Sequence, residues 1–70
     1  MKNDLYHIIS GTNEDRFDRT DTFEDAVRIA RSVVKREGRV QEPVLIEHRG
    51  MVLRQLVLMP DGKVVEDALA

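Results

Sequence analysis

The segment Met51–Met59 constrains the fold more than any other part of the chain, because seven of its nine residues are apolar. Neighbouring side chains of a strand point to opposite faces, so this segment would be apolar on both faces and would need cover on both. A chain of 70 residues with one predicted helix has cover for one face only. We therefore expect the other face to be open, and we assign Val52, Arg54, Leu56 and Leu58 to it. These residues either form a surface for a partner or a second copy, or are shielded by loops and by the Arg54 alkyl chain.

A helix is predicted from Thr22 or Phe23 to Glu37, with Gly38 as its stop. Thr22 begins a capping box, acidic residues fill the first turn and basic residues the last, as the helix dipole favours. Glu24 and Arg28 are spaced for an i,i+4 ion pair. The apolar stripe that would face the sheet recurs at helical period and consists of Phe23, Ala26, Val27, Ala30, Val33 and Val34.

Short segments rich in β-branched and apolar residues predict the strands, with tight turns at Arg49-Gly50 and Pro60–Gly62. We expect residues 1–70 to form a single two-layer α+β domain, in which one helix packs on one face of an antiparallel sheet of four to five strands. The first strand should pair near the long one, and the tail from Asp67 to Ala70 should fray. In chain order, two strands precede the helix and three follow it: Leu5–Ser10, Arg16–Thr20, Val44–His48, Met51–Met59 and Lys63–Glu66.

No residue cluster in the sequence indicates a chemistry. Cysteine is absent, and His7 and His48 lack further ligands at zinc-site spacing. Ser10 and Ser32, the two serines, do not lie in a nucleophile motif. We therefore expect no metal, no cofactor and no enzymatic activity. No apolar run approaches the roughly 20 residues of a membrane span, so we also expect a cytoplasmic protein.

Basic residues are concentrated in the predicted helix, although the whole chain has a net charge of −2. Two interpretations remain open: a solvated face that complements the helix dipole, or an electrostatic surface for an acidic partner. A protein partner fits the second interpretation better than nucleic acid does, because the chain is acidic overall and has only three aromatic residues. The residues of this basic helix face are Arg28, Arg31, Lys35, Arg36 and Arg39.

Four short motifs recur in the order and approximate spacing of a known family: Tyr6, Ile8 and Ile9, Arg28-Ile29-Ala30, Ile46-Glu47 before Gly50, and Asp61-Gly62-Lys63 followed by Val65 and Asp67. With these motifs the chain resembles a family of small phage anti-CRISPR proteins that inhibit the type I-F surveillance complex. The layout is also similar to many small bacterial proteins of unknown function with two strands, a helix and two strands. The first resemblance implies a non-enzymatic inhibitor that docks on Cas backbone subunits through basic helix residues and blocks pairing of guide and DNA; Arg28 is the residue that it would carry over.

Overall fold

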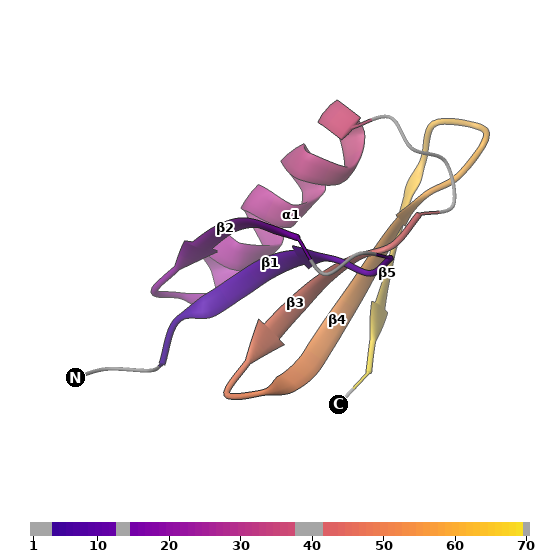
Figure 1. Ribbon diagram of the computed structural model, residues 1–70. Helices are drawn as coiled ribbons and strands as arrows, with labels where there is room; N and C mark the ends of the chain where they lie inside the picture. Colours follow the sequence, from indigo (N-terminus) through magenta and orange to yellow (C-terminus); the bar gives the residue numbers. More distant parts are fainter. Residues whose placement is uncertain (1–3, 13–14, 38–41, 70) are drawn as a thin grey trace.

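The computed structural model describes residues 4–12, 15–37 and 42–69 as five strands and one helix (Figure 1). The prediction of a two-layer α+β domain with an antiparallel sheet and a single helix is confirmed for these residues. The elements are β1 (Tyr6–Ser10), β2 (Arg16–Thr20), α1 (Phe23–Glu37), β3 (Val44–His48), β4 (Met51–Leu58) and β5 (Val64–Ala68).

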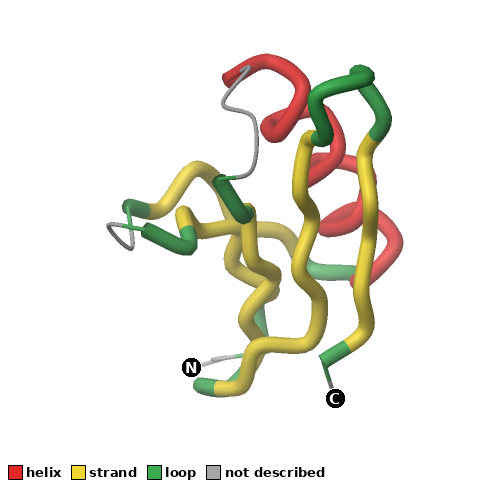
Figure 2. Tube along the Cα trace, turned by 90° about the vertical axis from the view of Figure 1, so that its right-hand side faces the viewer, coloured by secondary structure: helices red, strands yellow, loops and turns green. Residues whose placement is uncertain are grey.

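The five strands form one sheet in the order β2-β1-β3-β4-β5, and every neighbouring pair is antiparallel. The strands fan out across the sheet, and α1 packs on one face only (Figures 1 and 2). The first strand therefore lies beside β3, one strand away from the long strand β4. The chain crosses from the β1–β2 hairpin to β3 through α1.

The helix begins where the capping signal predicts it. The Thr22 hydroxyl accepts a hydrogen bond from the Asp25 amide at 3.2 Å, and the Thr22 carbonyl accepts one from the Ala26 amide at 3.0 Å. Its apolar stripe packs as predicted, with Phe23 and Val27 half-buried at the margin and Ile29 as an additional contact. The predicted stop, Gly38, lies outside the described residues. The fully buried core is Ile8, Ala26, Ala30, Val33, Val34, Val44, Ile46 and Leu56.

A tight hairpin and a β-bulge set the position of β4. Arg49 and Gly50 have φ angles of 56° and 77°, which is the type I′ geometry that a two-residue hairpin favours. The register with β3 then shifts: Glu47 pairs with Val52, whereas the preceding residue, Ile46, pairs with Arg54. Leu53 is thus the extra residue of a bulge, and such a residue changes which side chains face each side of the sheet.

The prediction for the open face was wrong at three of its four positions, because the side of β4 that carries Arg54, Leu56 and Leu58 is the one that the helix covers, and the bulge moves only Val52 to the opposite side. Leu56 is 0% exposed and lies under the helix, and Leu58 packs against the same core. Arg54 also lies on the helix side, where its guanidinium carbon is 4.8 Å from the centre of the Phe23 ring. Val52 alone was assigned to the correct face.

The last strand is longer than predicted. Asp67 and Ala68, expected to fray, pair with Gln55 and Arg54 of β4. The Leu69 amide extends this ladder by donating a hydrogen bond to the Leu53 carbonyl at 2.9 Å. Pairing with a long, well-anchored neighbour accounts for the ordered tail, because each added residue gains a backbone hydrogen bond.

Candidate functional site

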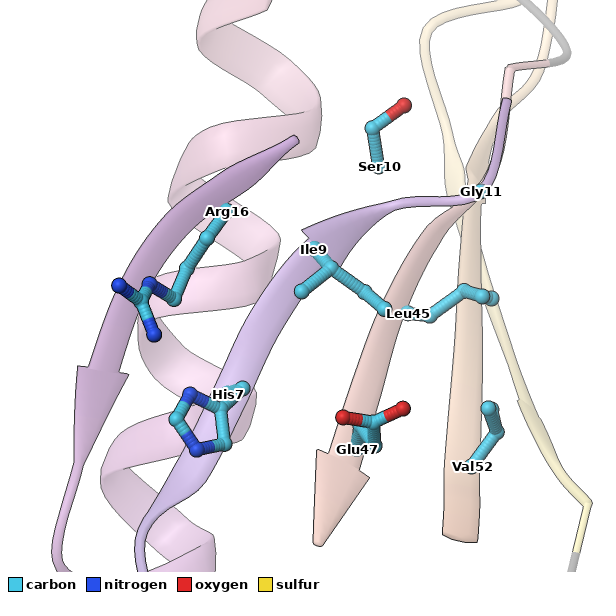
Figure 3. Close-up of a pocket in the computed structure, with 8 residues that line it drawn as sticks. All are labelled: His7, Ile9, Ser10, Gly11, Arg16, Leu45, Glu47 and Val52. Carbon is cyan, nitrogen blue, oxygen red and sulfur yellow. The ribbon is translucent and has the colours of Figure 1, made fainter. Parts of the chain in front are cut away.

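The one helix among the described residues lies on one face of the sheet (Figure 1), and we refer to the opposite face, part of which Figure 3 draws in close-up, as the open sheet face. Directly paired residues of an antiparallel sheet point to the same side, so the register identifies its members. One row crosses all five strands, and we call it the long row: Arg16, Ile9, Leu45, Gln55 and Asp67 on β2, β1, β3, β4 and β5.

A second row lies beside the first and contains both signs of charge. Arg19, His7, Glu47 and Val52 pair in turn across β2, β1, β3 and β4. Figure 3 shows His7, Glu47 and Val52 projecting from the sheet on the side away from the helix. Together, parts of the two rows line a surface concavity of about 620 Å³.

The concavity is lined by a mixture of apolar and polar side chains, because His7 and Glu47 lie on the same two inner strands as Ile9 and Leu45. Ile9, Leu45 and Val52 are half-buried, while Arg16 on the edge strand is exposed. Exposed apolar side chains beside a few charged groups are typical of a surface that takes a partner. Beyond the concavity, Val65 pairs with Val57 and is 41% exposed, so the apolar surface continues to the β5 edge.

The charges of the open sheet face are separated between its two edges. Arg16 and Arg19 lie on the edge strand β2, and Asp67 lies on the opposite edge strand β5. Glu47 lies on the central strand, opposite His7. A partner approaching this face would therefore meet a cationic edge, a centre in which apolar side chains lie beside His7 and Glu47, and an anionic edge.

The other side of the sheet is closed by side chains as well as by the helix. The Glu66 carboxylate accepts a hydrogen bond from Arg31 of α1 at 3.0 Å and lies 3.8 Å from the Arg54 Nε atom. Arg54 covers Phe23 on one side and, through its Nη1 atom, donates to the Leu53 carbonyl at 2.9 Å. This bridge connects β5 to the helix and explains why Arg54 is unavailable to a partner.

Most of the basic helix face is matched by acidic neighbours. Arg28 donates to Asp25 at 3.0 Å, so its partner is the i−3 residue and not the predicted Glu24. This Arg28 hydrogen bond, together with one from the Thr22 hydroxyl, holds the pKa of the Asp25 carboxyl below its ordinary value of 3.8. Arg36 lies 3.9 Å from Glu37.

The predicted basic residues nevertheless project into solvent from the helix. Arg28, Arg31, Lys35 and Arg36 are all exposed, and the Arg28 side chain retains 71% of its accessible surface. Arg39 lies outside the described residues. The structure thus brings together the described part of this face, but with its charge partly balanced.

The two histidines occupy different environments. The His48 ring stacks on Tyr6 with centroids 4.0 Å apart, and its Nε2 atom lies 3.1 Å from the Asp4 carbonyl oxygen. His7 lies on the open sheet face beside Glu47. Across residues 4–12, 15–37 and 42–69, no three His, Asp or Glu side chains gather in the manner of a metal site.

Sequence reasoning missed most members of the open sheet face. Ile9, Leu45 and Glu47 belong to predicted strands, but which of their two faces is covered depends on the pairing with distant strands. The alternation within Val44–His48 was the usable signal. Val44 and Ile46 point to one face and are both apolar, as a face packed on the helix requires, whereas the other face carries the charged residue Glu47.

The geometry defines the class of this protein as a small α+β domain with one covered and one open sheet face. No family model, curated protein or solved structure matches the chain. Among the described residues, no helix has the length and apolar character needed to span a membrane.

Proposed function

We propose that this chain is a non-catalytic protein-interaction module and that the open sheet face is its docking surface. The observation that carries the proposal is the concavity of about 620 Å³ on the sheet face opposite the helix, in which the apolar side chains of Ile9, Leu45 and Val52 lie beside charged ones. The opposite face, by contrast, is covered by the helix and by the Arg31–Glu66 and Arg54–Phe23 contacts.

Several features support a protein as the occupant. The surface spans strands β2 to β5 and combines apolar side chains with charges of both signs. Protein interfaces likewise combine apolar contacts with polar and charged ones. Val65 adds exposed apolar area near the β5 edge of this face.

Site-specific photo-crosslinking tests the docking surface. A photoreactive amino acid is placed at Gln55, on the open sheet face, or at Ser32, exposed on the helix. We expect one discrete adduct from position 55 that is lost when Leu45→Lys is added, because the new charge lies in the centre of the face. Adducts from position 32 that are insensitive to Leu45→Lys, with none from position 55, would refute this surface.

A second candidate is docking of an acidic partner by the basic helix face, as the anti-CRISPR resemblance implies. The observation in its favour is that Arg28, Arg31 and Lys35 project from one side of the helix and are exposed. The pairing of Arg28 with Asp25 and of Arg31 with Glu66 counts against it, because paired charges produce a weaker field.

The two candidates are distinguished by charge reversal on the helix. Arg28→Glu combined with Lys35→Glu should slow association with a type I-F surveillance complex sharply if the basic helix face docks there, because interface charges act first on the encounter rate. Duplex DNA alone is the control for non-specific attraction. Equal association rates for wild type and the double variant would eliminate this candidate and leave the open sheet face.

A further inference from the structure

The long row of the open sheet face has opposite charges at its two ends. It begins with Arg16 on one edge strand and ends with Asp67 on the other, and Leu45 on the central strand β3 is its midpoint. Read from either end, the row places an apolar or uncharged side chain between each end and the centre. A row with this pattern is complementary to itself when it is turned around at Leu45.

We infer that the partner of the open sheet face is a second copy of this chain, related to the first by a two-fold axis that runs parallel to β3 and passes over Leu45. This inference rests on the proposed function of the face. In the dimer, β2 of each copy lies over β5 of the other, so Arg16 of one copy meets Asp67 of the other, twice. The two Leu45 side chains meet on the axis.

Charge selects this axis over the other one that brings the two faces together. A two-fold axis perpendicular to the strands would place Arg16 over Arg16 and Asp67 over Asp67, and like charges facing each other across an interface are unfavourable. The axis parallel to β3 keeps the strands of the two sheets roughly aligned, which is the packing that twisted sheets adopt in sandwiches. It also makes the contact closed, since the same patch is used by both copies.

The size of the face predicts a weak dimer. Five strands of about five residues cover a projected area of roughly 300–400 Å² in each copy. Standard stable interfaces bury about 800 Å² on each partner, and smaller ones belong to transient complexes. We therefore expect dissociation constants on the order of micromolar or weaker.

Glu47 provides a second test of the axis, in which a substitution should strengthen the dimer and not weaken it. It lies two residues from Leu45 on β3, so the two copies bring their Glu47 carboxylates close to the same axis. Their repulsion should limit the affinity. Removing that charge should therefore tighten the dimer, whereas a face that binds an unrelated basic partner would lose affinity on the same change.

Sedimentation equilibrium from about 10 µM to 1 mM at low ionic strength tests the inference. We expect Arg16→Asp and Asp67→Arg to weaken self-association about tenfold each, and the double variant, which exchanges the two charges, to return to within about threefold of wild type. Glu47→Gln should tighten it several-fold. Arg28→Glu, on the helix, is the matched control and should leave it unchanged. Circular dichroism melts establish that each variant is folded.

The outcomes separate the inference from the proposed function. A strict monomer for both wild type and Glu47→Gln up to 1 mM would overturn the second copy as partner, while crosslinks from position 55 to another protein would leave the docking surface standing. A double variant no better than the single variants would overturn the axis. Weaker association of Glu47→Gln would do the same, because it would place that carboxylate in a favourable contact.

Discussion

Arg49 and Gly50 illustrate how two residues fix the geometry of a hairpin. Both adopt positive φ, at 56° and 77°, and the Arg49 side chain donates to the Asp4 carboxylate at 2.8 Å through its Nη2 atom. Positive φ is accessible to glycine but unfavourable for a residue with a Cβ. Arg49 is held in this region by the turn, with both partners of its ion pair largely exposed.

Gly50→Ala should therefore destabilise the protein by about 1–2 kcal/mol, as expected for a Cβ forced into the left-handed region. No atom lies within 4 Å of the added Cβ, so steric contact contributes nothing to this loss. Arg49→Asn is the control, because Asn tolerates positive φ, and an exposed ion pair is worth about 0–1 kcal/mol. Urea unfolding measures both. A Gly50→Ala variant as stable as wild type would contradict the turn geometry.

The lowered pKa of Asp25 predicts that the protein loses part of its free energy of unfolding at acidic pH. The Arg28 and Thr22 hydrogen bonds stabilise the ionised carboxylate in the folded state, so its folded pKa is below 3.8. Its contribution is present above the unfolded pKa and is lost as the pH falls through the folded value. Urea midpoints between about pH 2 and pH 6 should fall less steeply for Asp25→Asn than for wild type below pH 4.

Arg28→Ala provides the companion measurement. It removes the larger cause of the lowered pKa while leaving the Asp25 carboxyl in place. The fall of its urea midpoint below pH 4 should therefore be intermediate between those of wild type and Asp25→Asn. The same fall for all three proteins would mean that the Asp25 hydrogen bonds do not persist in solution.

At the scale of the element, strand β4 determines which surface of the protein is available. Strict alternation along Met51–Met59 groups Val52 with Arg54, Leu56 and Leu58, and this group was assigned to the open face; the helix covers Leu56 instead, and the bulge residue Leu53 separates Val52 from the group. The mixed character of the strand is the reason, because apolar residues on both faces fit either orientation equally well. Pairing of Leu56 with Val44 and Glu66 then determines its place under the helix.

A pair of matched substitutions distinguishes the two faces. Leu56→Lys buries an unpaired charge in the core, which costs several kcal/mol. Because the total free energy of unfolding of a small domain is about 5–15 kcal/mol, this variant should be largely unfolded. Leu45→Lys, one strand away on the open sheet face, should cost roughly 1 kcal/mol or less. Circular dichroism melts report both. A folded Leu56→Lys protein with an unfolded Leu45→Lys protein would reverse the assignment of the faces.

At the scale of the whole molecule, the sequence was sufficient for the elements and the layers. Helix α1, its cap at Thr22 and the strand order along the chain follow from local periodicity and turn residues, and they are found as predicted. The lateral order β2-β1-β3-β4-β5 and the side of β4 that faces solvent depend on pairings between distant residues. Periodicity carries no information about such pairings, which is why the members of the open sheet face could not be derived from it.

The position of β1 between β2 and β3 has a consequence for the route by which the chain folds. Ile8 pairs with Ile46, so this contact must close a loop that includes the entire helix. The β3–β4 hairpin closes over two residues, at far smaller entropic cost. We expect this hairpin to form early and the β1–β2 hairpin to dock late.

Stopped-flow kinetics check this order. Gly50→Ala should mainly slow folding, and Ile8→Val, which removes one buried methyl group, should mainly accelerate unfolding. The reverse pattern would place the β1 contact in the rate-limiting step. If the order holds, the Val44–His48 edge remains unpaired until the final event, and nascent chains are most prone to aggregate through that edge.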